Sequence, residues 1–248
     1  MTEPVLSIVI GTRNRRDAYW RFVTSVIATA SVPTELLIGD ASTDPYAQNM
    51  IPSETGNVVR FTVVPQNPPV GHVKGYNRMF RLATGKYVSW FNDDCEMLPG
   101  WDRIAIDYME AHPDLGIGCV YFKDNIATGH DCDYVVQTLY KTTYANFGVL
   151  LRTFGDQLGW FDEDLHMYGA DTALTYAALA AGKAVAPIPK CKTLHYREQD
   201  AVRAENYANT RSHSDRATFD RKWKYKVPDL REEMNRRFGH LRQPEAIQ

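Results

Sequence analysis

Short apolar runs alternate with longer amphipathic stretches along the first half of the chain. The apolar runs are rich in β-branched residues and stop at Gly, Asn or Asp, which predicts buried strands at residues 5–10, 35–40, 58–64 and 87–91. The segments between them predict helices at residues 17–30 and 73–83. Strands and helices that alternate across short turns form parallel βαβ units, so the pattern predicts an open α/β sheet.

The second half is less regular. A helix predicted at residues 101–111 leads into an apolar run at 116–122 and a polar loop up to about residue 133. Further on, we expect a strand at 144–151, a helix that ends at Gly182, and a strand at 184–188. No repeat or clear linker divides the chain. We therefore expect one α/β domain over residues 1–200 and a helical, basic extension over residues 201–248 that packs on it.

Charge and composition narrow the class of protein. The 248 residues are 44% hydrophobic and carry a formal charge of −2, which excludes a disordered chain and argues against a surface that binds nucleic acid or an anionic membrane as a whole. Residues 201–248 hold 11 Lys and Arg against 7 Asp and Glu, a local +4 that leaves −6 for residues 1–200. Within them, residues 221–226 interleave basic and aromatic side chains. This segment is either a docking place for an acidic acceptor, such as DNA, a phosphorylated polymer or a lipid headgroup, or a solvated helix packed by its aromatic residues.

The sequence also indicates the cellular compartment in which the protein is expected. No apolar stretch approaches the roughly 18–20 residues that a membrane span requires, and the N-terminus lacks the basic and apolar regions of a secretory signal. The cysteines are scattered and form no C-x-x-C pair; they are Cys95, Cys119, Cys132 and Cys191. Free thiols are typical of a reducing compartment, so we expect a cytoplasmic protein.

Polar residues follow three of the predicted strands, at residues 11–15, 40–44 and 92–96. Ligands of open α/β sheets bind beyond the carboxyl ends of the strands, so these segments are expected to share one crevice. Carboxylates packed together need a cation, and hard oxygen ligands favour Mg²⁺ or Mn²⁺. Neither a G-x-G-x-x-G fingerprint nor a P-loop motif follows the first strand. Metal and side chains would therefore have to meet any phosphate charge.

Four motifs in order carry a resemblance: Ser7–Arg15, Leu37–Asp44, Ala83–Tyr87 and Phe91–Asp94. Together they resemble the nucleotide-sugar half of family 2 glycosyltransferases, which have the GT-A fold, a Rossmann-like open mixed sheet flanked by helices. The likeness covers roughly residues 5–200 and continues through 159–163, 168–171 and His195.

The resemblance implies roles for particular donor-binding residues. It assigns Thr12, Asn14 and Arg15 to the nucleoside pocket, and it makes Asp40 the acceptor of the N3–H of a uracil or thymine. Residues 92–94 stand at the D-x-D metal motif, with Asn92 in place of its first acid. Asp94 is then the best metal ligand, and Asp93 is a candidate contact to ribose or donor sugar; the simpler alternative is a strand-end turn.

A second donor segment, Gly71–Arg78, departs from the family pattern. Tyr76 replaces the arginine that usually precedes Asn77. The phosphate-binding role of that arginine then passes to Lys74 or Arg78, or is absent. Asn77 is retained as a nucleotide-sugar-binding candidate.

On the acceptor side, Asp171 is the candidate general base, although an Asp before a helix also caps it. The family usually places an acid before this aspartate, whereas here it is Ala170. His195 matches a histidine that binds metal or diphosphate, with a structural hydrogen-bonding role as the alternative. Trp160 is either a stacking floor for the acceptor sugar or a core residue.

The sequence thus predicts a glycosyltransferase that depends on Mn²⁺ or Mg²⁺. It would move a sugar from a UDP- or dTDP-sugar to an acceptor hydroxyl with inversion, the acceptor being a glycan, nucleic acid, lipid or protein. Alternatives are a retaining enzyme of the same fold, because Ala170 weakens the base motif, and a catalytically silent nucleotide-sugar-binding module.

Overall fold

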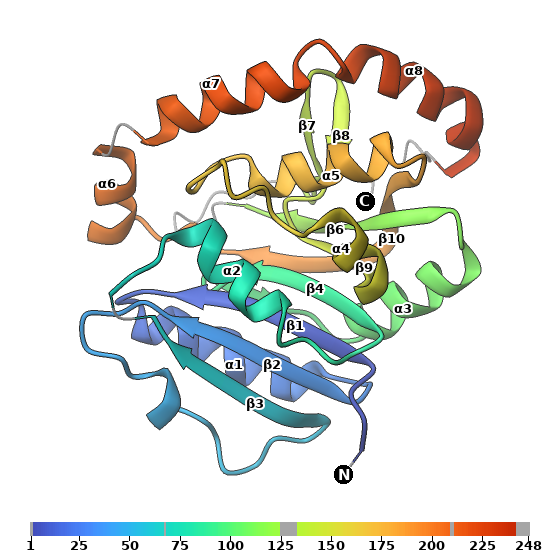
Figure 1. Ribbon diagram of the computed structural model, residues 1–248. Coiled ribbons are helices and arrows are strands. Elements are labelled where there is room, and N and C mark those ends of the chain that lie inside the picture. The colour runs from blue at the N-terminus through green and yellow to red at the C-terminus, as the bar shows by residue number, and fades with distance from the viewer. Residues whose placement is uncertain (1, 67, 125–132, 209–210, 242–248) are drawn as a thin grey trace.

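The computed structural model describes residues 2–66, 68–124, 133–208 and 211–241 (Figure 1). Its strands are β1 Leu6–Thr12, β2 Thr34–Asp40, β3 Val58–Pro65, β4 Tyr87–Asn92, β5 Cys95–Met97, β6 Leu115–Lys123, β7 Gln137–Leu139, β8 Thr142–Tyr144, β9 Gly148–Leu151 and β10 Ala184–His195. Its helices are α1 Arg16–Thr29, α2 His72–Phe80, α3 Trp101–Ala111, α4 Arg152–Leu158, α5 Ala170–Ala180, α6 Ala201–Ala208, α7 Arg211–Trp223 and α8 Val227–Phe238, with short 3₁₀ turns at Ala47–Asn49 and Gly239–Leu241.

Eight of these strands form one mixed sheet in the order β3-β2-β1-β4-β9-β6-β10-β5, and β7 pairs with β8 in a separate hairpin. Strands β3, β2, β1 and β4 run parallel, whereas β9 is antiparallel to both of its neighbours. Helix α1 passes behind the sheet and α2 in front of it (Figure 1). The open α/β sheet that the hydrophobic pattern predicts is therefore confirmed.

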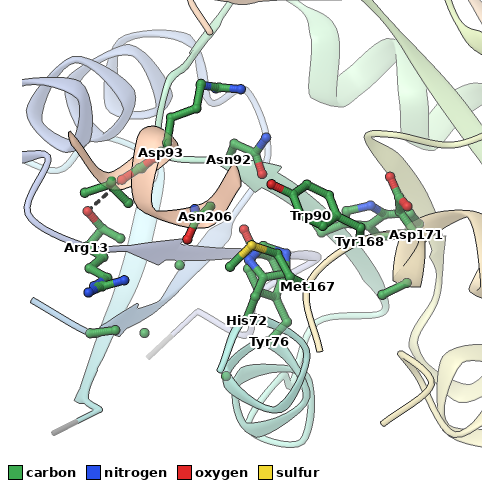
Figure 2. A pocket seen from close by; sticks show the side chains of 18 of the residues that line it. Arg13, His72, Tyr76, Trp90, Asn92, Asp93, Met167, Tyr168, Asp171 and Asn206 are labelled. Atoms are coloured by element: carbon green, nitrogen blue, oxygen red, sulfur yellow. Dashed lines mark hydrogen bonds between the residues drawn. The ribbon is translucent and has the colours of Figure 1, made fainter. Parts of the chain in front are cut away.

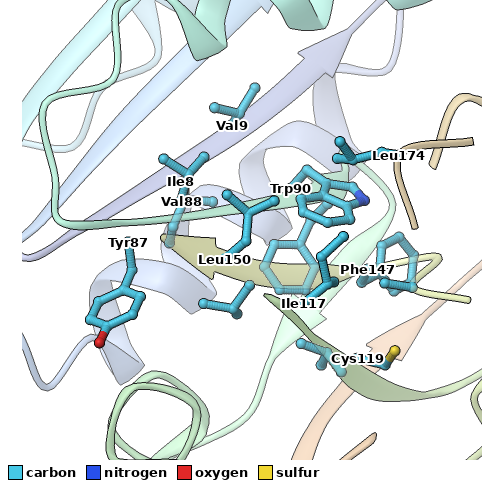
Figure 3. Packing of buried hydrophobic residues seen from close by; sticks show 14 of the residues in the cluster. Ile8, Val9, Tyr87, Val88, Trp90, Ile117, Cys119, Phe147, Leu150 and Leu174 are labelled. Atoms are coloured by element: carbon cyan, nitrogen blue, oxygen red, sulfur yellow. The ribbon is translucent and has the colours of Figure 1, made fainter. Parts of the chain in front are cut away.

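The central strands are buried because they are apolar on both faces. Residues of β1 and β4 such as Ile8, Val9 and Val88 are fully buried and pack with Ile117 and Leu150 of the neighbouring strands (Figure 3). Burying one such aliphatic side chain contributes about 1.5–3 kcal/mol. This core fixes the register of the parallel strands, in which Thr12 lies opposite Asp40 and Gly11 opposite Asn92. The polar ends of three strands consequently meet at one edge of the sheet.

The structure departs from the predicted elements in the second half. The strand expected at 144–151 is split, since only residues 148–151 form β9, which pairs with β4 and β6, whereas Tyr144 ends the hairpin strand β8 and residues 145–147 connect the two. Strand β10 extends to His195 instead of ending at residue 188, because its last three residues pair with the short strand β5. The polar loop expected at 123–133 lies largely outside the described residues.

The C-terminal residues that the structure describes are helical and join the same core as the sheet. Phe219 of α7 and Val227, Met234 and Phe238 of α8 are buried. Helix α7 runs along the α5 side of the molecule, above the β7–β8 hairpin in Figure 1. Among the described helices, none is long and apolar enough to cross a membrane.

Candidate active site

A cavity of about 760 Å³ lies beyond the carboxyl ends of β1 and β4. This volume is within the range of pockets that hold cofactor-sized ligands. Figure 2 shows Arg13 and Asp93 on one side, Tyr168 and Asp171 on the other, and Trp90, Asn92 and Met167 between them. The cavity therefore brings the first strand, Asn92 and Asp93 of the residue 92–94 motif and the start of α5 together around one space, whereas Asp94 is fully buried and does not line it.

The predicted nucleoside residues divide between the cavity wall and the loop behind it. Thr12 and Arg15 line the cavity, and the Thr12 hydroxyl donates to Asp93 Oδ2 at 2.8 Å. Asn14 instead turns to the adjacent loop, where its amide exchanges hydrogen bonds with Thr43. Its backbone has a φ of 54°, one of the less common conformations for a non-glycine residue.

Asp40 is turned into its own loop. Its carboxylate is 1% exposed and accepts backbone N–H groups from Ser42 at 3.0 Å, Tyr46 at 2.8 Å and Ala47 at 2.9 Å. Three of about four lone-pair sites of the carboxylate are thus in use. Asp40 thus shapes its own loop, while its neighbours Gly39 and Ala41 line the cavity.

Asp93 and Asp94 are adjacent buried carboxylates in contrasting surroundings. Burial raises the pKa of Asp93, and the charge of Asp94 adds to the rise although Arg15 opposes it. Burial alone would also raise the pKa of Asp94, but His195, Arg15 and Arg203 together hold it below its ordinary value. Asp94 is therefore the ionised member of the pair.

Asp94 and His195 face each other across the sheet edge. The pairing of β5 with β10 sets His195 opposite Cys95, which brings His195 Nε2 within 3.2 Å of Asp94 Oδ1. Neither atom has a well-aligned hydrogen-bond partner among the described residues, although both are buried. On the other side of the ring, His195 Nδ1 lies 2.9 Å from Asp124 Oδ1, in a contact that is likewise not a well-aligned hydrogen bond. A carboxylate on one ring nitrogen orients a histidine whose other nitrogen binds metal.

A divalent cation fits this arrangement. One ligand atom each of Asp94, Cys95 and His195 lies within 4.8 Å of the others, and Asp94 Oδ1 and His195 Nε2 are buried without a well-aligned hydrogen-bond partner. A carboxylate with an imidazole suits Mn²⁺, whereas burial raises the pKa of the Cys95 thiol well above its ordinary value and keeps it protonated. Within this cluster of described residues, Asp94 and His195 are thus the side chains whose chemistry suits a divalent cation.

The arginines that line the cavity each have a carboxylate partner. Arg15 donates to Asp200 at 2.6 Å and contacts Asp93 at 3.3 Å. The other pairs are Arg13 with Glu205, Arg197 with Asp124, and Arg203 with Asp94. These pairs leave little free positive charge along the described walls.

Asp171 stands at the other end of the cavity, at the start of α5. Gly169 precedes that helix with a φ of +80°, a conformation that favours glycine and turns the chain sharply into it. Burial raises the pKa of Asp171 to about 6, although the N–H of Thr172 donates to its Oδ1 at 2.7 Å. A carboxyl with this pKa is a stronger base than an ordinary aspartate and is still ionised at neutral pH.

Helix α2 presents other residues to the cavity than those predicted. Lys74 and Arg78 are exposed and do not line it. Asn77 is 1% exposed, and its amide bridges the backbone of Phe161, donating to its O at 2.9 Å and accepting from its N at 3.0 Å. The wall is formed by His72 and Tyr76, whose rings lie 4.5 Å apart. Because Tyr76 donates its hydroxyl to Phe91 O at 2.6 Å, it ties α2 to β4 where an arginine was expected.

Trp160 lies in the core. Its ring is 6% exposed and stacks on Phe80 at 4.5 Å, and its indole N–H donates to Asp156 at 3.0 Å. The tryptophan that lines the cavity is Trp90, which the sequence pattern marked only as part of a strand. The structure thus favours the core alternative for Trp160.

The basic segment at residues 221–226 does not line the cavity. Lys222 donates to both Asp162 and Asp164 at 2.6 Å, and Tyr225 is 81% exposed. Several other cavity residues carry no local motif and were not predicted from the sequence: Gln66, Asp124, Gln137, Tyr144 and Arg203.

Comparison with known proteins places this geometry in a family. The model of "Glycosyl transferase family 2" matches residues 7–154, more than half of the chain. No curated protein matches the sequence.

Solved structures share the fold at 16% identity. S. aureus TarS 1–349 in complex with UDP-GlcNAc superposes with a TM-score of 0.64 over 79% of this chain and 59% of its own. Mannosyltransferase PcManGT from Pyrobaculum calidifontis, in complex with GDP-Man and Mn²⁺, superposes with a TM-score of 0.66 over 95% of this chain and 70% of its own. A longer S. aureus TarS structure gives a TM-score of 0.61, and this chain spans 36% of it. The curled mixed sheet flanked by helices is the GT-A fold, and the chain belongs to glycosyl transferase family 2.

Proposed function

We propose that this enzyme transfers a sugar from a UDP- or dTDP-sugar to an acceptor hydroxyl with inversion, using Mn²⁺ or Mg²⁺. The observation that carries the proposal is the cavity itself, which is lined by Asp93 and His195 at one end and by Asp171 at the other, with the buried Asp94 behind the wall beside His195. A leaving group and an acceptor hydroxyl need such opposed sites, because one side gains negative charge while the other loses a proton.

The charge balance of the cavity supports a metal requirement. The four lining arginines are already paired with carboxylates, so they offer a diphosphate little uncompensated positive charge. A divalent cation held by Asp94 and His195 would act as a Lewis acid toward the departing diphosphate. Asp93, bonded to Thr12 and Arg15, would contact the ribose or donor sugar. The ligands named in the two related structures, UDP-GlcNAc and GDP-Man with Mn²⁺, support a nucleotide-sugar donor.

At the acceptor end, Asp171 would take the proton of the attacking hydroxyl. Its burial is the reason for its raised pKa, and that pKa matches the work of a general base near neutral pH. Ala170, in the position where the family pattern has an acid, is 2% exposed and packs in the core, so Asp171 would carry this role alone. Tyr144 and Tyr168 beside it would contact the acceptor.

The buried cysteines bear on the cellular compartment, and the basic segment at 221–226 bears on where an acceptor could dock. Three free cysteines, Cys95, Cys119 and Cys191, are buried as thiols, which supports work in a reducing, cytoplasmic compartment; Cys132 lies outside the described residues. The basic segment at 221–226 lies off the cavity, so an acidic acceptor docked there would need to extend from it to Asp171.

The test is transfer from purified nucleotide sugars with Mn²⁺ or Mg²⁺, followed by NMR of the anomeric proton of the product. We expect UDP- or dTDP-sugar to be consumed and the anomeric configuration to be inverted. A retained configuration would contradict the role of Asp171 as sole base. Donor binding without hydrolysis or transfer over a broad acceptor panel would instead identify a silent binding module.

A further inference from the structure

Helix α7, in the C-terminal extension, binds the loop that leads to Asp171. Its Asp215 is 1% exposed, and its carboxylate accepts three successive backbone N–H groups: His166 at 2.9 Å, Met167 at 2.9 Å and Tyr168 at 3.0 Å. Burial opposes ionisation of Asp215, yet these N–H groups outweigh it and hold its pKa below the ordinary value. A carboxylate with this many donors around it fixes the path of the backbone that supplies them.

Other side chains of α7 contact the same loop on either side of residues 166–168. Lys222 donates to Asp162 and Asp164 at 2.6 Å each. The ring of Phe219 packs on Gly169, where an added Cβ would come within 3.3 Å of it. Asp215 and Phe219 are one helical turn apart, so they act on consecutive parts of the segment from 166 to 169.

The held segment forms the acceptor end of the cavity. Met167, Tyr168 and Gly169 line it, and Asp171 follows two residues later (Figure 2). With Gly169 in a left-handed conformation, the direction of the chain into α5 depends on where residues 166–168 are anchored. A shift of this anchor would move the Asp171 carboxylate and the Tyr168 ring together.

We propose that Asp215 is a positioning residue for acceptor activation, which acts by anchoring the backbone of residues 166–168 so that Asp171 and Tyr168 face the acceptor. This inference rests on the proposed function. It gives α7 a part in the active site that its sequence, read as a basic extension, does not suggest.

The experiment compares the full-length wild type with Asp215→Asn by hydrogen–deuterium exchange and by steady-state kinetics. The amide variant keeps the shape but turns an NH₂ group toward N–H donors, so at least one of them loses its acceptor. We expect faster exchange confined to peptides that cover residues 164–172. Transfer should show a kcat lowered at least tenfold and a raised acceptor KM, whereas donor KM should change less than twofold. A misplacement of about 1 Å can cost on the order of 100-fold in rate.

The controls separate positioning from loss of structure. Glu233→Gln makes the same acid-to-amide change on α8, where Glu233 pairs only with Arg236 and Arg237 on the surface, and it should change neither readout. Asp215→Glu, which retains the carboxylate, should recover part of kcat. If Asp215→Asn does not fold, Phe219→Leu loosens the same segment without a buried charge and should give the same exchange and kinetic pattern.

The outcomes are distinct. Unchanged exchange at residues 164–172, or faster exchange with wild-type kcat and acceptor KM, overturns the positioning role. An equal rise in donor KM and acceptor KM would also overturn it, because the substitution would then disturb the whole cavity and not the acceptor end alone. A wild type that transfers no sugar defeats the proposed function instead, and it does so independently of the exchange result.

Discussion

Replacing Asp171 by Asn should slow transfer severely and at the same time stabilise the fold at neutral and alkaline pH. Asn keeps an oxygen that can accept the 2.7 Å bond from the Thr172 N–H, so this contact in the first turn of α5 is retained. The change removes only the ionisable group. Loss of a general base lowers kcat by roughly 10²–10⁴-fold.

The size of the stability gain follows from the pKa of Asp171, which burial raises from 3.8 to about 6. A difference of about 2 units is worth about 3 kcal/mol, at roughly 1.4 kcal/mol per unit. The carboxylate borders an open cavity, where solvent screens its charge, so we expect about 1–2 kcal/mol. For a protein of this size, that is a rise in Tm of roughly 2–8 °C.

The sign depends on pH. Because the folded-state pKa of Asp171 exceeds the unfolded one, the folded state binds the proton more tightly. The penalty for the wild type is absent below pH 3.8, grows as the pH rises to about 6, and is constant above it. Urea unfolding of both proteins at pH 4 and pH 8 measures it. Equal stabilities of the two proteins at pH 8 would refute the reasoning about burial. Transfer by the variant at the wild-type rate would refute the reasoning about catalysis.

Other predictions follow from the same contacts. The kcat/KM of the wild type should fall as the pH drops through about 6, where Asp171 takes up a proton, and a flat profile from pH 5 to 8 would count against its role. Asp94→Asn should weaken Mn²⁺ binding at least tenfold by calorimetry, whereas undiminished affinity would remove Asp94 from the metal site. Glu35→Gln should cost about 2–4 kcal/mol in urea unfolding, because this buried carboxylate accepts from Ser7 Oγ and from the N–H groups of Thr84 and Gly85; a loss below about 0.5 kcal/mol would disprove that. Trp160→Phe should lower stability by about 1–3 kcal/mol and leave acceptor KM unchanged, and a raised KM would return Trp160 to the acceptor site.

Much of the N-terminal half could be predicted from sequence because its signals are local. The β-branched runs of β1 and β4 are buried on both faces, and parallel strands deliver their polar ends to one edge whatever the exact register. This is why the meeting of Thr12 with Asp93 is implicit in the motifs that follow the two strands.

The features that escaped prediction depend on contacts between distant segments. Strand β5 has only three residues, too few for a periodic pattern, so its pairing with β10 was not predicted, although the resemblance already names both Asp94 and His195, which this pairing brings together, as metal ligands. Trp160 and Trp90 are both tryptophans beside apolar residues, and only tertiary packing on Phe80 sends the first into the core. Asp215 gave no signal, because its partners are backbone groups about 48 residues away.

The most direct test of the account is calorimetric titration of the enzyme with UDP in the presence of Mn²⁺ and again with EDTA, for the wild type and for Asp171→Asn. The account predicts tight binding with Mn²⁺, binding at least tenfold weaker with EDTA, and the same UDP affinity in both proteins, since Asp171 stands at the acceptor end. UDP affinity that ignores the metal, or that collapses in Asp171→Asn, would contradict the division of the cavity into a metal-bound donor end and a basic acceptor end.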